Sequence, residues 1–161
     1  MSQDLNALVA EGFSARYLEL AGNITKLSDC LSENQFWQNP FSFGNSFGHL
    51  VLHLTGNLNY YIGAEIAVTG YIRDRDREFS ETKRLPKGEA LKKFNDAVSM
   101  VVSTLKSQTA ADWEKTYIAK GEETAGTRFS IFLRCITHLH HHLGQMNYLC
   151  FELVGKKATG L

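Results

Sequence analysis

Apolar residues recur at steps of three and four along four long stretches of the chain, the spacing that gathers them on one face of an α-helix. The stretches cover residues 5–31, 45–70, 87–107 and 127–155. Asn45 or Ser46 can cap the second stretch and Thr127 the fourth, and Gly155 is placed to end the last one. The pattern therefore predicts four amphipathic helices.

The connections between these stretches are long. Residues 32–44 and 71–86 lack an apolar period and are predicted to be loops, the second of them a surface loop across one end of the domain. Residues 109–112 can start a short helical turn, and residues 113–126 are predicted to form a loop or small hairpin. With almost no β-type alternation, the chain is predicted to be an all-α four-helix bundle with long inter-helix loops, a single domain over residues 1–161. Connections of this length permit crossovers, so the pattern leaves the order of the helices open.

The composition narrows the classes of partner. The 161 residues carry 17 basic and 17 acidic side chains, which gives a formal net charge of zero. We therefore expect a small-molecule partner and no nucleic-acid partner. Three widely spaced cysteines without a C-x-x-C pair fit a reducing cytoplasm better than a disulfide framework. No secretory signal and no window of ~20 apolar residues is visible, so we expect a soluble protein that does not enter the membrane.

The chemistry is concentrated in histidines, four of which fall within five residues of the last predicted helix. With ~100° per residue and Leu139 pointing to the core, His138 and His142 share one flank, His140 lies on the other, and His141 points outward. Imidazoles at i and i+4 can reach one ion. An arbitrary pair with this spacing is more often a solvated helix edge, so a further ligand is needed.

The second predicted helix supplies that candidate. His49 and His53 are also four apart, but His53 lies beside the apolar stripe and His49 farther out. Imidazoles from His53, His138 and His142 would leave a fourth coordination position open for water or substrate, as in catalytic zinc sites. Imidazole also suits nickel, iron and copper. No Asp or Glu stands close in sequence to the last-helix pair, which lowers the case for a di-iron bundle.

The segments His53-Leu-Thr-Gly-Asn-Leu58 and His138-Leu-His-His-His142-Leu-Gly-Gln145 together resemble the DinB/YfiT-like superfamily, and the order of the helices extends this resemblance over nearly the whole chain. Residues 70–79 also look like a DinB-related branch of small proteins. The resemblance implies a four-helix bundle, commonly a homodimer, that holds a divalent metal with His53, His138 and His142. Zinc or nickel is the first candidate, followed by iron or manganese. Some relatives are enzymes that use a low-molecular-weight thiol such as bacillithiol or mycothiol, and others have no assigned activity. DNA binding is not implied.

The preferred hypothesis is a metal-dependent thiol (S-)transferase acting on small molecules, in which the open position binds a thiol and presents it as thiolate to an electrophile. A metal-dependent hydrolase would need a general base, for which Glu65 and Glu152 are the helix acids to test. The alternative outside catalysis is a metal-binding or stress-associated dimer. No catalytic side chain is identified, because Cys135 and Cys150 fall on the inner stripe of the last helix as small core residues.

Three further features border the predicted ligands. Asn57 and Gln145 are candidates for hydrogen bonds that orient them. Residues 73–79 alternate arginines with acids, which predicts a self-neutralised, solvated loop; the functional alternative is a lid over the site or a contact for an anion. Gly144, on the flank opposite the paired histidines, offers room for another helix to approach.

Overall fold

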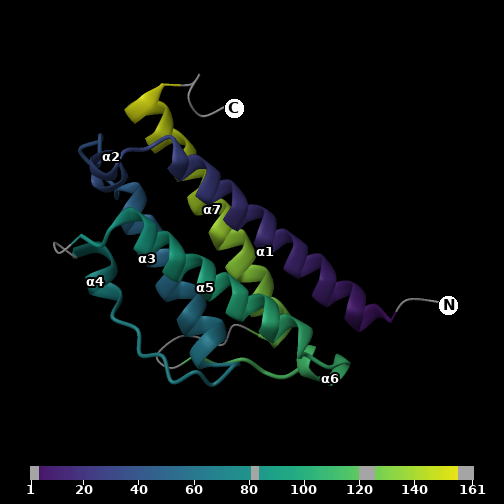
Figure 1. Cartoon of the computed structure of the whole chain (residues 1–161). Helices are drawn as coiled ribbons and strands as arrows, with labels where there is room; N and C mark the ends of the chain where they lie inside the picture. The colour runs from purple at the N-terminus through teal and green to yellow at the C-terminus, as the bar shows by residue number, and fades with distance from the viewer. Residues whose placement is uncertain (1–3, 81–83, 120–125, 156–161) are drawn as a thin grey trace.

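The computed structural model describes residues 4–80, 84–119 and 126–155, and the regular elements in this part of the chain are all helices (Figure 1), which confirms the all-α class. Long helices fall in all four predicted stretches: α1 (Leu5–Asp29), α3 (Phe47–Leu58), α5 (Lys87–Lys106) and α7 (Arg128–Val154). A π-helical turn, η1 (Asn59–Ala64), continues α3. Shorter helices interrupt the connections: α2 (Glu33–Trp37), α4 (Arg75–Ser80) and α6 (Ala110–Trp113).

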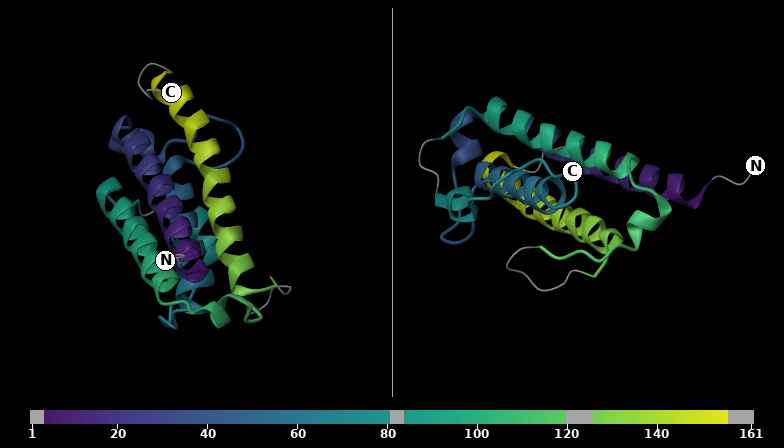
Figure 2. Two further views of the ribbon diagram at one scale, coloured as in Figure 1. Left: turned by 90° about the vertical axis from the view of Figure 1, so that its right-hand side faces the viewer. Right: turned by 90° about the horizontal axis from the view of Figure 1, so that it is seen from below.

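The long helices pack around one another in a closed order. Helix α1 contacts α5 and α7, and α3 contacts the same two helices, so each long helix has two long neighbours (Figure 2). Within the described ranges no strand forms; Thr116 and Thr127 make one isolated antiparallel bridge where a loop or small hairpin was predicted. No helix in this part of the chain has the length and apolar character needed to span a bilayer.

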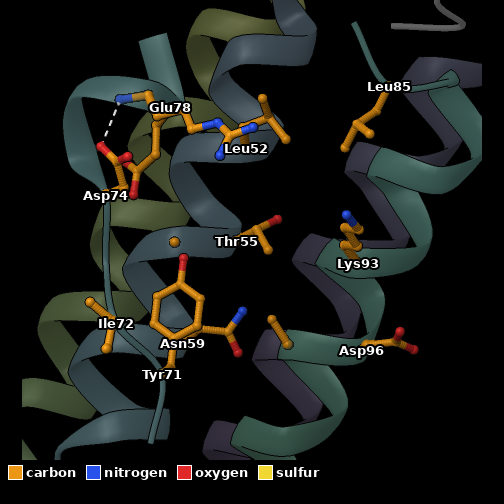
Figure 3. A pocket seen from close by; sticks show the side chains of 13 residues that line it. Leu52, Thr55, Asn59, Tyr71, Ile72, Asp74, Glu78, Leu85, Lys93 and Asp96 are labelled. Atoms are coloured by element: carbon orange, nitrogen blue, oxygen red, sulfur yellow. Dashed lines mark hydrogen bonds between the residues drawn. The ribbon is translucent and has the colours of Figure 1, made fainter. Parts of the chain in front are cut away.

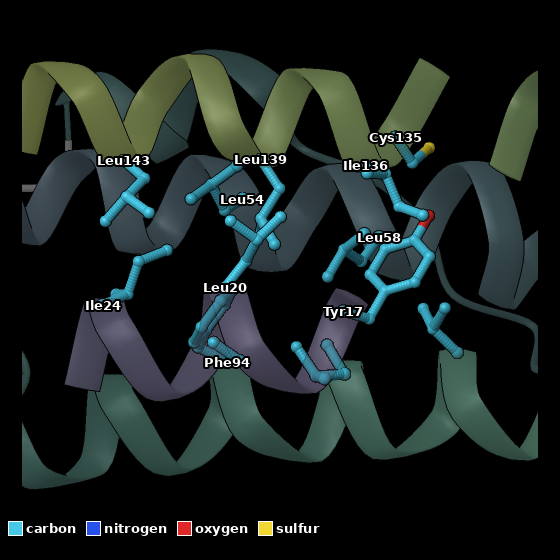
Figure 4. Close-up of a cluster of buried hydrophobic side chains, with 14 of the residues drawn as sticks. Tyr17, Leu20, Ile24, Leu54, Leu58, Phe94, Cys135, Ile136, Leu139 and Leu143 are labelled. Atoms are coloured by element: carbon cyan, nitrogen blue, oxygen red, sulfur yellow. The ribbon is translucent and has the colours of Figure 1, made fainter. Parts of the chain in front are cut away.

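The core lies between the four long helices and takes side chains from each of them (Figure 4). Tyr17, Leu54, Phe94 and Leu139, from α1, α3, α5 and α7, are each at most 1 % exposed. Burying one such side chain contributes roughly 1.5–3 kcal/mol. The Tyr17 hydroxyl keeps its hydrogen bond inside this core by donating to the Phe132 carbonyl at 2.8 Å. The core therefore holds α3 and α7 in a defined register, which matters because both carry histidines.

Local capping sets the ends of the two histidine-bearing helices as predicted. The Ser46 hydroxyl accepts from the backbone N–H of His49 and starts α3, and the Thr127 hydroxyl accepts from that of Ser130 and starts α7. Gly155 ends α7 with φ +82°, a backbone conformation that glycine adopts without strain. The two cysteines of α7 are buried in the core, as predicted.

The second predicted helix differs from the expectation at its C-terminal end. Helix α3 stops at Leu58, and in η1 the N–H of Glu65 bonds the carbonyl of Tyr60, five residues back, at 3.3 Å. The Tyr117 hydroxyl donates to the Tyr61 carbonyl at 2.8 Å. Apolar residues at steps of four fit both an α-helical and a π-helical turn, so periodicity alone does not reveal it.

The prediction of a loop over residues 32–44 was wrong for its first part. Ser32 and Gln35 form a capping box that starts α2. Phe36 and Trp37 are then buried, at 0 % and 4 % exposure. A Cβ on Gly48 of α3 would collide with the Trp37 ring, so this glycine allows α2 to pack closely. Five residues are too few to show a helical period.

The prediction of a surface loop over residues 71–86 was also wrong in part. Helix α4 forms inside it and packs on α3. The consequence is the burial of Glu78, which is only 7 % exposed. Because the charges of this segment alternate, the sequence offered no apolar stripe from which a packed helix could be predicted.

Candidate metal centre

Three histidines from two helices meet between α3 and α7. His53 projects from α3, and His138 and His142 lie one turn apart on α7. Nε2 of His138 is 3.2 Å from Nε2 of His53 and 3.0 Å from Nε2 of His142. The ring centroids are 4.5 to 5.0 Å apart and the rings stand nearly perpendicular to one another. The structure thus brings together all three residues singled out on the helical wheel, and they could hold a metal ion.

The spacing of these nitrogens matches a tetrahedral ion. Nitrogens bound to zinc at 2.0–2.1 Å are about 3.3 Å apart, close to the two Nε2 separations of 3.0 and 3.2 Å. Hydrogen bonding accounts for only part of this approach, since a single proton on Nε2 of His138 cannot be donated fully to both neighbours. A cation at the centre would satisfy all three lone pairs at once.

Neighbouring side chains turn two of the rings so that Nε2 is free to coordinate. Nδ1 of His53 lies 2.9 Å from Oε2 of Glu78, and Nδ1 of His142 lies 2.7 Å from Oε1 of Gln145. Each Nδ1–H donates to an oxygen, so each Nε2 keeps its lone pair. Gln145 therefore makes the orienting contact that its position in the sequence had suggested.

Glu78 is held in turn by Arg73, and sequence reasoning missed both. Arg73 donates from Nε to Oε1 at 2.7 Å and from its terminal nitrogen to Oε2 at 2.9 Å, a two-point contact. Burial raises the pKa of Glu78, but the hydrogen bonds and positive charges of His53 and Arg73 outweigh it, so the pKa lies below its usual value. Glu78 is a carboxylate at neutral pH and favours the Nδ1–H tautomer of His53.

The prediction of a solvated loop over residues 73–79 is corrected accordingly. Arg73 and Glu78 form a buried ion pair, and the Phe79 ring packs 4.8 Å from that of His53. The intervening residues 74–77 are exposed, as predicted. One signal was available in the sequence: Gly56, three residues after His53, where a Cβ would overlap the Glu78 carboxylate.

The two rings on α7 are held in the neutral form that binds metals. Burial lowers the pKa of His138 to about 3, helped by repulsion from the charged forms of His142 and His53. Burial likewise lowers the pKa of His142 to about 4, although the hydrogen bond with Gln145 acts in the opposite direction. Both imidazoles therefore offer unprotonated nitrogens at neutral pH.

The remaining candidates are not part of the cluster, although the ring of His141 lies 5.1 Å from that of His142. His49 contacts the Ser46 hydroxyl at 2.8 Å, and His140 and His141 are exposed on α7. Neither Glu65 nor Glu152 belongs to the histidine cluster. A Cβ on Gly144 would meet nothing within 4 Å among the described residues, so none of the described helices packs against that position.

Two cavities flank Glu78 and the histidines. The larger one, ≈ 700 Å³, lies between α3, α5 and the segment before α4, with Thr55, Asn59 and Tyr71 on its walls (Figure 3). Glu78 borders it, but none of the three clustered histidines does. The smaller one, ≈ 270 Å³, is lined by His138 together with Asn57, Tyr61, Cys135 and three arginines. The smaller cavity is therefore the one that reaches the histidine cluster.

The fold and site define a class: an all-helical protein in which histidines from two helices form a cluster able to hold a metal ion. Residues 13–161 match the family described as "Protein of unknown function (DUF1572)", and the chain belongs to that family. This family is grouped with the DinB/YfiT-like proteins, in agreement with the resemblance of the histidine segments. No curated protein matches the chain.

Proposed function

We propose that His53, His138 and His142 bind a divalent metal ion, zinc or nickel first and iron or manganese next, and that the protein is a metal-dependent transferase for a small-molecule thiol. The observation that carries the proposal is the convergence of three Nε2 atoms, two of them freed for coordination by Glu78 and Gln145. A metal bound there lowers the pKa of a coordinated thiol and presents it as thiolate.

The protein residues supply orientation and leave room for a ligand. Arg73 fixes Glu78, and Glu78 fixes the His53 ring, so the imidazole is positioned before any ligand arrives. Within the described residues, the cluster contains three His, Cys, Asp or Glu side chains and not a fourth. Three protein ligands are typical of catalytic sites, which keep one position for substrate.

Thiol transfer is favoured over hydrolysis because the carboxylate that contacts the cluster, in the part of the chain that the structure describes, is a poor general base. Glu78, the carboxylate at the cluster, accepts three hydrogen bonds and has a lowered pKa, so it is a weak proton acceptor. We take the sulfur from the substrate, because Cys135 is only 1 % exposed and burial, with the neighbouring Cys30, raises the pKa of Cys150 to about 12.

The proposal also covers the architecture, the compartment and the partners of the protein. The contacts of α1, α3, α5 and α7 support a four-helix bundle as the architecture. Three free cysteines agree with a reducing compartment such as the cytoplasm. A homodimer and a small-molecule substrate are the partners that we propose.

The test begins with metal content, measured by elemental mass spectrometry on tag-free protein. Wild type and His141→Ala are expected to carry near-stoichiometric metal, and His53→Ala and His138→Ala to lose it. A folded wild type that takes up no zinc, nickel, iron or manganese would remove the proposal. Metal-loaded protein is then assayed with small thiols and an aromatic electrophile such as 1-chloro-2,4-dinitrobenzene. Stoichiometric metal without turnover for any thiol would leave the non-catalytic metal-binding alternative.

A further inference from the structure

Two of the three cysteines lie side by side at one end of the bundle. Cys30 follows the last residue of α1, and Cys150 lies about one turn before the end of α7. These two helix ends are adjacent (Figure 1), and the Cys150 thiol donates to the carbonyl of Leu27 at 3.8 Å. The Cys30 thiol donates to the same carbonyl at 2.8 Å. Cysteines from the first and the last long helix thus share one acceptor.

The end of α1 explains why both thiols turn to this oxygen. Leu27 lies in the last turn of the helix, where backbone carbonyls lose their helical partners. The N–H of Leu31, four residues on, donates to the carbonyl of Ser28 instead, at 3.1 Å. Burial raises the pKa of Cys150 to about 12, and the charge and a side-chain hydrogen bond of Cys30 add to this effect, so the two thiols are direct neighbours.

The two thiols differ in their access to solvent. Cys30 is half-buried, whereas Cys150 is 0 % exposed. A reagent in solution can therefore meet Cys30 but not Cys150. The raised pKa also keeps Cys150 almost fully protonated near neutral pH, and the thiolate is the form that attacks. Cys150 is consequently restricted to slow reaction with a sulfur held beside it, and the adjacent sulfur is that of Cys30.

The third cysteine does not belong to this pair. Cys135 lies roughly 22 Å from Cys150 along α7, at a rise of about 1.5 Å per residue. Its side chain is 1 % exposed among the core residues. Cys135 therefore provides a matched control, because it is a buried cysteine on the same helix without a place in the pair.

We infer that Cys30 and Cys150 are a site of oxidation, at which a peroxide converts the two thiols to a disulfide that joins α1 to α7. In the first step the sulfur of Cys30 attacks hydrogen peroxide, the O–O bond breaks, and a sulfenic acid forms while water leaves. In the second step the sulfur of Cys150 attacks that of Cys30, the S–O bond breaks, and a second water leaves. The two thiols together give up two electrons, which reduce one peroxide.

This site goes beyond the proposed thiol transfer and does not depend on it. Cys150 lies about 12 Å beyond His142 along α7. The disulfide adds a covalent link where α2 already contacts α7, since the side-chain amide of Gln35 donates to the carbonyl of Leu153 at 3.2 Å. Disulfides in a reducing compartment are usually transient, and small thiols reverse them by exchange. A link that forms with peroxide and opens with thiols fits that setting.

The test exposes the full-length protein, as purified, to a small excess of hydrogen peroxide at pH 8 for several hours. Intact mass is then measured after free thiols are alkylated under denaturing conditions. Wild type and Cys135→Ala are expected to lose two alkylatable thiols and about 2 Da, and dithiothreitol is expected to restore both. Digestion of the oxidised wild type with chymotrypsin, which cuts between Cys135 and Cys150, should yield one linked peptide pair containing Cys30 and Cys150.

Two further variants test the order of the steps. Cys150→Ala is expected to stop at the sulfenic acid of Cys30, which dimedone traps as an adduct, and Cys30→Ala to give neither adduct nor disulfide. Circular dichroism checks that each variant is folded, and the peptide map of wild type needs no variant at all. Three free thiols in wild type after peroxide, or a disulfide that involves Cys135 or joins two chains, would overturn the inference. Loss of metal binding leaves these readouts unchanged, so the site stands or falls separately from the proposed function.

Discussion

Replacing Glu78 by Gln tests how the buried carboxylate prepares His53. The change keeps the size of the side chain but exchanges one acceptor oxygen for an NH2 group. Glu78 accepts from His53 Nδ1 at 2.9 Å and from two Arg73 nitrogens at 2.7 and 2.9 Å, so Gln must place its NH2 against a former donor. If that donor is His53, the ring can respond by moving its proton to Nε2, the atom proposed to coordinate.

Glu78→Gln is expected to lower the affinity for zinc strongly and the free energy of unfolding moderately. Changes to residues that orient metal ligands typically reduce affinity 10- to 100-fold, which corresponds to about 1.4–2.7 kcal/mol. The Arg73 side chain, only 10 % exposed, also loses its charged partner. Loss of a hydrogen bond to a charged group costs about 1.5–3 kcal/mol of unfolding free energy.

The assay is a competition for zinc against a chromophoric chelator, with urea unfolding of the metal-free protein in parallel. Asp76→Asn is the control, because it makes the same acid-to-amide change at an exposed position of α4. Glu78→Gln is expected to bind zinc at least about tenfold more weakly than Asp76→Asn and wild type. Equal affinities in all three proteins would show that the carboxylate does not control the tautomer of His53.

Three further predictions concern the packing and the titratable groups. Gly56→Ala is expected to lower the melting temperature, because the added Cβ overlaps the buried Glu78 carboxylate. The control Gly22→Ala lies in open space on α1 and should add about 1 kcal/mol of stability from helix propensity, so calorimetry should show opposite shifts of the melting temperature in the two variants. The pKa values of His138 and His142 lie below the ordinary value, so the unfolded chain binds more protons as pH falls from 6.5 towards 4. Metal-free stability should therefore drop over that window, by up to about 1.4 kcal/mol per pH unit for each ring, and urea titrations of a variant with Gln at both positions should show a shallower slope. At pH 8 the Cys150 thiol, with its pKa raised to about 12, should stay unlabelled by DTNB in the native state, so Cys150→Ser and wild type should give the same count of fast thiols.

The clustering of the three histidines could be predicted from the sequence because each part of the prediction depends on local geometry. His138 and His142 lie four apart on a continuous helix, so one turn of backbone places both rings on one flank. His53 stood out since it borders the apolar stripe of α3. That α3 and α7 face each other was supplied by the expectation of a bundle, and the 3.2 Å approach of His53 to His138 agrees with it.

The partner of His53 could not be found in this way. Glu78 is 25 residues from His53, in a segment whose alternating charges indicate exposure. Its burial depends on α4 packing on α3 over Gly56, a contact that no periodic pattern encodes. The position of Arg73 depends on the same packing, because the carboxylate that accepts its two hydrogen bonds is that of Glu78.

Local sequence patterns were sufficient to predict the long helices, their caps at Ser46, Thr127 and Gly155, and the flank on which each histidine lies. All of these depend on interactions within about one helical turn. Packing of distant segments was needed to form the π-helical turn after Leu58, to bury Glu78, and to close the ≈ 270 Å³ cavity lined by residues of α3, α4 and α7. These features arise where segments far apart in the chain compete for the same space, and that competition is settled by packing rather than by local preference.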